Sequence, residues 1–283
     1  MNTPVNEWRS PLIWFGGKAR LAHRLIDLMP PHKVYVELFG GGAHVIAAKP
    51  PTSCDVYNDI DGDLVNFLLV LREDPDRFAQ ACETLPYSRA LFERWKWEES
   101  PDDPFERAVR WFYGNRSAIA GGNAYKTGWA HSRHAGVNPA LKWARVPDRF
   151  RSFSERMRGV MIECRDFREV LRVYDSPQTL FYADPPYVGQ EHNYKGGFSA
   201  DDHRELAAML ANIRGRAMVS YYPHPFVDQL YAGWQRSTLG SYRFGRPGCD
   251  VKEQATELVL ANYQLLTQPD LFEVETNLEG WWE

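Results

Sequence analysis

Short apolar runs alternate with amphipathic stretches along much of the chain. The first run, residues 34–39, meets three glycines at 40–42 and continues into a helical stretch at 43–49. A second run at 53–58 is followed by a helix expected over 62–72, which carries leucine and phenylalanine on one face. Strand, glycine turn, helix and strand in this order predict a βαβ unit, because parallel strands need a crossover connection.

A long segment without strand-like patterning interrupts this organisation. Residues 76–158 are mostly helical in pattern, and a glycine-rich stretch at 120–128 predicts a loop within them. Strands are expected again at 160–163, 179–183, 217–221 and 257–261, with helices at 167–173, 200–213 and 225–231. The sequence therefore predicts an α/β fold whose sheet is interrupted by a helical module.

Composition narrows the class of protein. The chain has 283 residues, of which 44% are apolar and 25% charged, as in ordinary globular proteins. No window approaches the ~18 consecutive apolar residues of a membrane span, and the first residues lack a signal-peptide pattern, so a cytoplasmic protein without membrane contact is expected. The four cysteines are scattered and form no Cys-x-x-Cys pair, which predicts neither a disulfide framework nor a metal site.

The charge is unevenly distributed. The formal net charge is −4, which by itself argues against strong nucleic-acid binding. Residues 105–172, however, carry 14 Lys and Arg against six acids, so the rest of the chain carries −12. Aromatic residues lie among these basic ones, namely Trp111, Phe112, Tyr113, Tyr125, Trp129, Trp143 and Phe153. The mixture suits phosphate contacts and base stacking, although a solvated basic helix surface is the simpler alternative.

The glycine turn at 40–42 is a candidate ligand site. Such a turn brings backbone N–H groups close to a ligand, and an acid at the end of the next strand, Asp59, can hold ribose hydroxyls. The dinucleotide pattern Gly-x-Gly-x-x-Gly is absent, which disfavours NAD. A plain tight turn with Asp59 as a helix cap is the alternative.

The tetrapeptide Asp184-Pro185-Pro186-Tyr187 directly follows the strand expected at 179–183. Two prolines end that strand, so the Asp184 carboxylate, the Pro185 carbonyl and the Tyr187 ring are expected at the carboxyl edge of the sheet. An aromatic amine is a weak nucleophile because its lone pair is delocalised into the ring. Two acceptors on its N–H bonds favour a pyramidal nitrogen, and Tyr187 is expected to stack on the base. A purely structural turn is the alternative.

Three motifs in order carry a family resemblance. They are Trp14-Phe15-Gly16-Gly17-Lys18, Glu37-Leu38-Phe39-Gly40-Gly41-Gly42 and Asp184-Pro185-Pro186-Tyr187. With them the chain resembles the Dam-type DNA adenine methyltransferases, which transfer a methyl group from S-adenosylmethionine to the 6-amino group of adenine. The resemblance covers about residues 11–263. It implies a Rossmann-like sheet domain that is catalytic (1–60 and 159–265), a helical DNA target-recognition domain (61–158) and an acidic tail (266–283).

The resemblance also implies roles for individual residues. The catalytic residues would be Asp184, Pro185, Pro186 and Tyr187. The residues that contact S-adenosylmethionine would be Trp14, Lys18, Glu37, Phe39, Gly40, Gly42, Asp59, Ile60, Asp166, Phe167 and Asp184. Lys18 is a suitable charge partner for the methionine carboxylate, and an aromatic ring from Trp14 or Phe39 suits the sulfonium. No metal is implied.

The inserted module departs from the family pattern. Relatives that read GATC carry a distinctive stretch after an Asn-Arg pair, whereas here Asn115-Arg116 is followed by a different sequence, so GATC is not predicted. Candidate contacts to double-stranded DNA are Asn115, Arg116, Asn123, Lys126 and Arg133. The glycine-containing segment 188–199 is expected to close over a flipped base.

Other activities stay open at this point. The same fold serves enzymes that methylate RNA bases or protein glutamine, and a non-catalytic DNA-binding relative is a further alternative. The Asp at position 184 and the Gly-Gly-Lys segment favour DNA adenine. A separate restriction endonuclease as partner and a solitary methyltransferase are both compatible with the sequence. It predicts neither the oligomeric state nor the role of Trp281-Trp282, whose acidic surroundings disfavour DNA contact.

Overall fold

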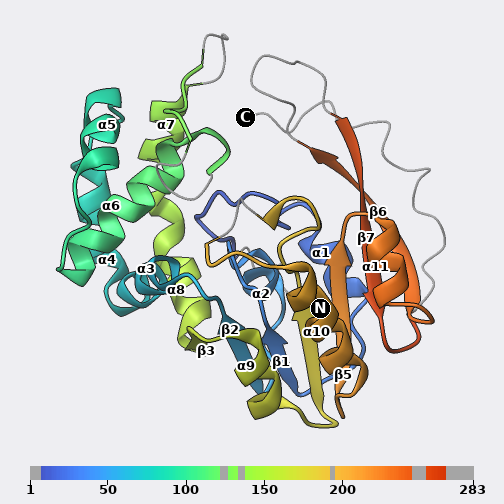
Figure 1. Cartoon of the computed structure of the whole chain (residues 1–283). Helices are drawn as coiled ribbons and strands as arrows, with labels where there is room; N and C mark the ends of the chain where they lie inside the picture. Colours follow the sequence, from blue (N-terminus) through green and yellow to red (C-terminus); the bar gives the residue numbers. More distant parts are fainter. Residues whose placement is uncertain (1–7, 122–126, 133–137, 192–194, 244–252, 266–283) are drawn as a thin grey trace, which may run out of the picture.

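The computed structural model describes residues 8–121, 127–132, 138–191, 195–243 and 253–265. Within these ranges one sheet contains seven strands in the order β3-β2-β1-β4-β5-β7-β6. The pairs from β3 to β5 are parallel, and β7 runs antiparallel to both of its neighbours. Figure 1 shows this sheet with a group of helices to one side of it. None of the described helices has the length and hydrophobicity of a membrane-spanning segment.

The strands agree well with the apolar runs, except at one edge. Their bounds are β1 (Val34–Glu37), β2 (Cys54–Asn58), β3 (Val160–Glu163), β4 (Thr179–Ala183), β5 (Arg216–Tyr221), β6 (Gln235–Arg243) and β7 (Glu253–Ala261). The sequence did not predict β6, and it predicted only the second half of β7. The β6 sequence is mostly polar and small, because this strand lies at the edge of the sheet and need not bury both faces.

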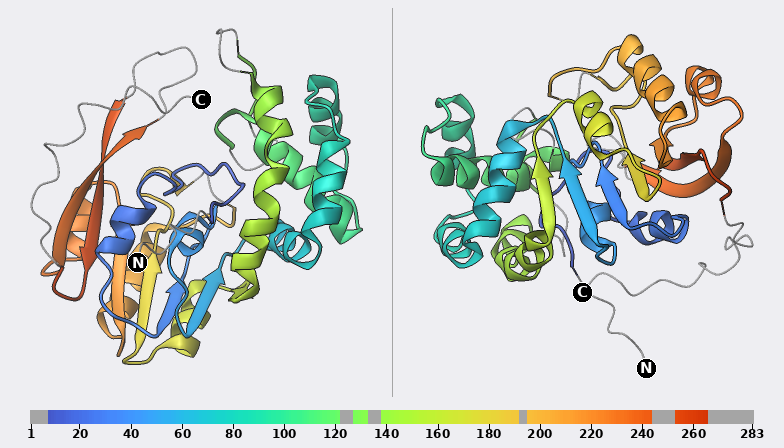
Figure 2. Two further views of the ribbon diagram at one scale, coloured as in Figure 1. Left: turned by 180° about the vertical axis from the view of Figure 1, so that it is seen from behind. Right: turned by 90° about the horizontal axis from the view of Figure 1, so that it is seen from below.

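Helices cover both faces of the sheet (Figure 2). One face packs against α9 (Phe167–Tyr174), α10 (Ala200–Ala211) and α11 (Pro225–Leu230), and the other against α1 (Ala22–Asp27) and α2 (His44–Ala48). Successive strand residues point to opposite faces, so Val36, Val56 and Phe181 join the first core while Tyr35, Tyr57 and Tyr182 join the second. The α1 helix was not predicted from the sequence.

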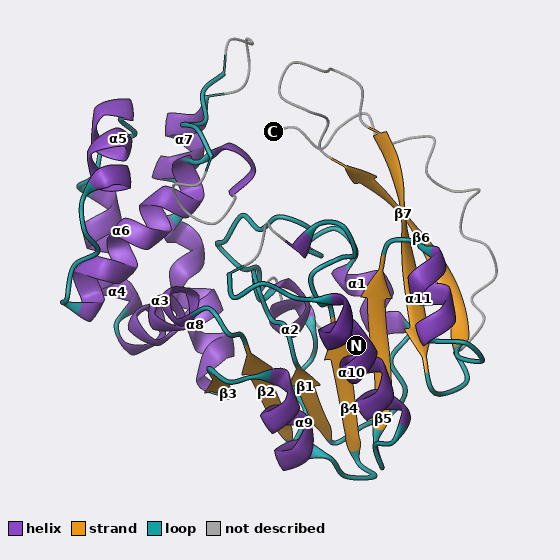
Figure 3. Cartoon of the chain, in the orientation of Figure 1, coloured by secondary structure: helices purple, strands orange, loops and turns teal. Residues whose placement is uncertain are grey.

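The chain between β2 and β3 forms the helical module (Figure 3). Its helices are α3 (Gly62–Glu73), α4 (Pro75–Glu83), α5 (Arg89–Trp97), α6 (Pro104–Ser117), α7 (Pro139–Ala144) and α8 (Phe150–Arg158), with 3-10 turns at Ile119–Gly121 and Pro147–Arg149. Helix starts are well specified: the Asp103 side chain accepts the N–H of Glu106, and Pro104 occupies the first turn of α6. The apolar core of the module is continuous with that of the adjacent sheet face.

Five of the aromatic residues of the basic stretch belong to this core. Phe112 and Tyr113 are fully buried, Trp143 is 6% exposed, and the Phe112 ring stacks on Phe67 with centroids 5.0 Å apart. Trp111 and Phe153 are buried as well. The suggestion that these five aromatics stack on bases is therefore wrong. Aromatic residues at helical spacing stabilise the module itself, since each buries a large apolar area.

The strand order places a ligand crevice between β1 and β4. From β1 the chain proceeds to β2 on one side, and from β4 it proceeds to β5 on the other, so the strand order reverses at this pair. Glu37 on β1 is in register with Tyr57 on β2 and with Tyr182 on β4. The residues two positions further, Phe39, Asp59 and Asp184, therefore reach the same level at the carboxyl edge of the sheet.

Candidate active site

A pocket lies at this edge of the sheet. It encloses about 940 Å³ of space, open solvent at its mouth included. All three sequence motifs contribute to its wall, together with the segment after Asp59. The lining residues are Trp14, Phe15, Gly17, Lys18, Glu37, Phe39, Gly40, Gly41, Gly42, His44, Val45, Asp59, Ile60, Asp61, Gly121, Asp184, Pro186, Lys195, Gly197 and Phe198.

The glycine turn forms the floor of the pocket through close packing. A Cβ atom on Gly40 would lie 2.1 Å from the Tyr57 ring, so no larger residue fits there. Gly41 has φ +46°, and a Cβ on it would lie 2.4 Å from Trp14 Nε1. The Tyr57 hydroxyl donates to the Gly41 carbonyl at 2.7 Å. Absence of side chains thus lets Tyr57 and Trp14 contact the turn from two sides.

Two acids stand along the β1–β2 side of the pocket. Asp59 accepts the N–H of Gly41 at 2.8 Å through one oxygen and that of Asp61 at 2.9 Å through the other. Burial raises the Asp59 pKa to about 6, against the effect of these N–H groups. Glu37 is 3% exposed, accepts the N–H of Ile46, and has its pKa raised well above the usual range by burial. These two acids therefore offer carboxyl oxygens as acceptors to a ligand that carries hydroxyl donors.

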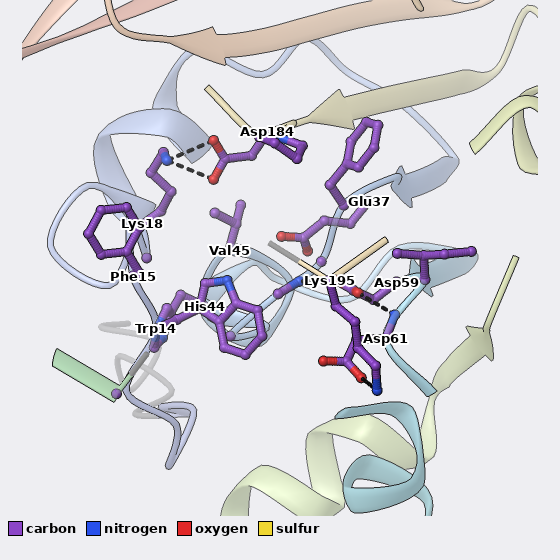
Figure 4. A pocket seen from close by; sticks show the side chains of 18 of the residues that line it. Trp14, Phe15, Lys18, Glu37, His44, Val45, Asp59, Asp61, Asp184 and Lys195 are labelled. Carbon is purple, nitrogen blue, oxygen red and sulfur yellow. Dashed lines mark hydrogen bonds and ion pairs between the residues drawn. The ribbon is translucent and has the colours of Figure 1, made fainter. Parts of the chain in front are cut away.

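Lys18 and Asp184 meet on the opposite side of the pocket (Figure 4). Lys18 Nζ lies 2.8 Å and 2.6 Å from the two Asp184 carboxylate oxygens, and it also donates to the Gly16 carbonyl at 2.9 Å. Burial raises the Asp184 pKa, and the Lys18 ammonium acts in the opposite direction. Residues 166 positions apart thus form one charged pair beside the glycine turn.

Tyr187 lies beneath this pair rather than open to the pocket. Its side chain is 4% exposed, its hydroxyl lies 2.9 Å from Asp184 Oδ1, and the Tyr222 ring packs edge-on with centroids 4.4 Å apart. Stacking of this ring on a base, which the sequence suggested, stays a prediction. The hydroxyl also contacts the carboxyl group of Glu257 on β7.

Several residues in or next to the pocket were not assigned a catalytic or cofactor-binding role from the sequence. Glu257 reaches the site only because β7 is antiparallel to β5, with Leu258 opposite Tyr221, and nothing in its local sequence marks it. His44 follows the glycine turn, and burial next to Lys18 lowers its pKa to about 4, so it is neutral at physiological pH. Lys195 and Phe198 line the pocket. They belong to segment 188–199, which the sequence predicted to close over a flipped base, so its glycine content was the signal that could have identified them.

Two of the predicted donor-binding residues do not line the pocket. Asp166 caps α9 by accepting the N–H of Arg168 at 2.8 Å, and the Arg168 guanidinium pairs with its other oxygen at 2.9 Å. Phe167 is 5% exposed and packs against Phe39, which does line the pocket, with ring centroids 5.5 Å apart. Phe167 thus supports the wall from behind.

The predicted DNA contacts divide into two groups. Asn123, Lys126 and Arg133 lie outside the described residues, so their contacts to DNA stay predictions. The Asn115 side chain is fully buried and bonds to the backbone of Ile13 and Gly121. Arg116 donates to the Pro11 carbonyl at 3.0 Å. Asn115 and Arg116 thus connect α6 by hydrogen bonds to the segment that precedes Trp14.

Another set of basic side chains is open to solvent. Lys142, Arg145 and Arg149, here called the basic trio, lie on and just after α7 and are exposed. No hydrogen bond or ion pair to their side chains is seen within the described part of the chain. By contrast Arg110 pairs with Glu98 and Glu106, and Arg156 is buried on Asp55. The basic trio is therefore exposed charge, without an ion-pair partner among the described residues, that the module offers to phosphates.

Comparison with known proteins agrees with this arrangement. The sequence model of a family described as D12 class N6 adenine-specific DNA methyltransferase matches residues 14–240. A DNA adenine methylase of Vibrio cholerae is 25% identical over 261 residues, which cover 84% of this chain and 90% of the relative. A DNA adenine methylase of Escherichia coli is 25% identical over 186 residues, which cover 64% of this chain and 65% of that protein. A DNA N-6-adenine-methyltransferase of Escherichia phage P1 is 24% identical over 240 residues, which cover 79% of this chain and 31% of that protein.

Proposed function

The chain belongs to the D12 class of N6 adenine-specific DNA methyltransferases, and on that premise we propose that its pocket binds S-adenosylmethionine while Asp184 holds the target adenine. Methylation of adenine in DNA is the activity of the family and of this chain. One observation carries the assignment of the site: Asp59 and the Lys18–Asp184 pair, far apart in the sequence, line the same pocket at the reversal of strand order.

The lining residues fit an adenosyl sulfonium compound. Asp59 uses one lone pair of each oxygen on a backbone N–H, so each oxygen retains acceptor capacity for a ribose hydroxyl. Phe39 and Phe198 supply apolar surface suited to a purine ring, with centroids 5.6 Å apart at an edge-on angle. Glu37 and Asp184 line the same pocket, and the ionised Asp184 carboxylate favours a cationic sulfur there. When bound, this donor supplies an electrophilic methyl group.

Asp184 is positioned to bind the target amine. A carboxylate has about four lone-pair sites. Lys18 and Tyr187 occupy two on Oδ1, and Lys18 occupies one on Oδ2, so one site on Oδ2 remains for an N–H of the substrate. A hydrogen bond from that N–H to Asp184 reduces the delocalisation of the nitrogen lone pair into the adenine ring, so the lone pair becomes available to the methyl group. The Pro185 carbonyl is the second acceptor in this proposal, and Pro186 forms part of the pocket wall.

DNA is recognised by the helical module in this proposal. The basic trio contacts phosphates, whereas Asn115 and Arg116 position the module relative to the pocket instead of touching bases. A base within a duplex cannot reach Asp184, so the target adenine has to leave the stack. Asn123, Lys126 and Arg133 are further proposed contacts to bases or phosphates of the DNA.

Donor binding tests the assignment of the pocket. We expect calorimetric titration to show that the wild type binds S-adenosylmethionine and S-adenosylhomocysteine. Asp59→Asn should weaken this binding about tenfold or more, because the substitution replaces a charged acceptor by a neutral amide. Asp228→Asn is the matched control, since Asp228 lies on α11 and pairs only with Arg236 among the described residues. Equal affinity of Asp59→Asn and wild type would contradict the placement of the ribose.

A further inference from the structure

Glu257 on β7 is a buried acid that the proposed reaction does not yet use. Its side chain is 3% exposed, it contacts the Tyr187 hydroxyl, and it lies 3.3 Å from Lys18 Nζ. Lys18, Asp184, Tyr187 and Glu257 thus form one buried group, here called the acid–lysine cluster. The cluster contains two carboxyl groups and one ammonium group, so its charge depends on whether both acids are ionised.

The contacts of the Tyr187 hydroxyl decide how many protons the cluster holds. Its oxygen receives a hydrogen bond from Lys18 Nζ at 2.7 Å, and it also contacts Asp184 Oδ1 at 2.9 Å and Glu257 Oε1. A hydroxyl has one hydrogen, and an ionised carboxylate has none to give. The hydroxyl can therefore donate to only one of the two acids. The other contact is a hydrogen bond only if that acid carries a proton and donates to the tyrosine oxygen.

The charges around the cluster also favour one retained proton. Within the part of the chain that the structure describes, Lys18 is the one cation that pairs with both acids. Among the described residues, the other titratable groups near the cluster are Glu37, Tyr182 and Tyr221, whose pKa values are raised by burial, and His44, which is neutral. Two ionised carboxylates would leave an uncompensated negative charge in a buried place, which costs several kcal/mol.

Glu257 is the acid that retains the proton. Both Asp184 oxygens lie within hydrogen-bond distance of Lys18 Nζ, which stabilises the ionised form against the effect of burial, and its side chain is 19% exposed. Glu257 is 3% exposed and more distant from the ammonium group. Burial and the negative charge of Asp184 raise the Glu257 pKa to about 7, in opposition to Lys18.

We propose that Glu257 is a positioning residue: it is held protonated, donates to the Tyr187 hydroxyl, and thereby directs that hydroxyl toward Asp184 Oδ1. Asp184 is then fixed with its remaining Oδ2 site open to the substrate. Ionisation of Glu257 would turn the hydroxyl away from Asp184 and place a second anion beside Lys18. The effect on catalysis rests on the role proposed above for Asp184, whereas the protonation of Glu257 is a property of the protein alone.

The protonation of Glu257 is tested first in the isolated protein, without DNA or methyl donor. Infrared difference spectra of wild type against Glu257→Gln at pH 6 should contain the carbonyl stretch of a protonated carboxyl group, and the same band should disappear as the pH is raised to 9. Glu73→Gln, an exposed residue at the end of α3, should leave no such difference band. Absence of the Glu257 band at pH 6 would overturn the proposal, whatever the catalytic activity.

A second variant covers the case in which Glu257→Gln does not fold. Carboxyl-¹³C glutamate identifies bands of protonated glutamate in the otherwise unchanged protein. Tyr187→Phe should then shift the Glu257 band, because it removes the acceptor of the proton, but not the band of Glu37, which has no hydrogen bond to Tyr187 in the described structure. If no labelled band responds to Tyr187→Phe, the proposed hydrogen bond does not exist.

The pH profile separates positioning from a merely structural role. The single-turnover methylation rate of the wild type should fall by up to about tenfold per pH unit once Glu257 ionises, with little change in KM for DNA. Glu257→Gln keeps a neutral donor, so its rate should lack this alkaline fall. An unchanged alkaline fall in Glu257→Gln would overturn the positioning role. If the wild type shows the infrared band of protonated Glu257 but neither it nor Glu257→Gln methylates DNA, the result would instead contradict the proposed function.

Discussion

The Asn115 side chain holds the backbone of Ile13 at both of its polar groups: Oδ1 accepts the Ile13 N–H at 3.1 Å, and Nδ2 donates to the Ile13 carbonyl at 2.7 Å. Nδ2 also donates to the Gly121 carbonyl at 3.2 Å. Ile13 directly precedes Trp14, which packs on the glycine turn. The end of α6 in the helical module is therefore connected to the donor pocket by one buried amide.

We predict that Asn115→Ala destabilises the fold by about 2–4 kcal/mol, because it leaves buried backbone groups without partners. It should also weaken binding of S-adenosylmethionine through the loosened Trp14 segment. Chemical denaturation and calorimetric titration measure the two effects. Asn138→Ala, which removes an exposed helix cap, should cost about 1 kcal/mol and leave donor affinity alone. Unchanged stability and donor affinity in Asn115→Ala would refute this connection.

Lys195 links the segment after the catalytic turn to the start of α3. Its Nζ lies 2.9 Å from Asp61 Oδ1 and 2.7 Å from Asp63 Oδ2, while its side chain is 51% exposed. We expect Lys195→Ala to change stability by less than ~1 kcal/mol but to speed release of S-adenosylhomocysteine about two- to fivefold. Stopped-flow displacement measures the release. Lys33→Ala, an exposed lysine before β1, is the control. Identical release rates would count against closure of this segment over the pocket.

The raised pKa of Asp59 predicts pH-dependent donor binding. Ribose hydroxyls bind the ionised carboxylate better, and the Asp59 pKa is about 6. Affinity for S-adenosylmethionine should therefore be constant above pH 7 and fall below pH 6, approaching about tenfold per pH unit. The weaker affinity of Asp59→Asn should lack this fall. A wild-type affinity that is independent of pH between 5 and 7 would contradict the proposed contact.

The basic trio predicts a contribution to DNA affinity that does not depend on base sequence. Arg149→Ala should weaken binding equally for different DNA sequences and reduce the salt slope of the binding constant by about one. Fluorescence anisotropy at several salt concentrations measures both. Arg151→Ala is a nearby control, because Arg151 already pairs with Asp76. If the two variants behave alike, phosphate binding lies elsewhere on the module.

Local sequence predicted the parts of the fold whose patterns are local. The apolar runs gave β1 to β5, and the motif residues Lys18, Asp59 and Asp184 do meet in one pocket. The β6 strand was missed because an edge strand needs few apolar residues. Glu257 was missed because only the antiparallel register of β7 brings it to the site.

The helical module shows that amino-acid composition alone does not predict which side chains contact DNA. Five aromatic residues of its basic stretch lie in the core, and Asn115 binds the backbone, although both resembled nucleic-acid contacts in the sequence. Composition does not tell which side of a helix faces solvent, and tertiary packing decides that question. Asp166 likewise caps a helix, as short acidic side chains before helices commonly do.

Methylation of DNA by Asp184 variants tests the central claim most directly. Purified wild type, Asp184→Ala and Asp184→Asn are incubated with labelled S-adenosylmethionine and unmethylated DNA, and nucleosides are analysed by mass spectrometry. The account predicts N6-methyladenine with the wild type and at least about a hundredfold lower rate in both variants, with DNA binding retained. Wild-type methylation that persists in folded Asp184→Ala, or label transferred to RNA or protein but not to DNA, would contradict it.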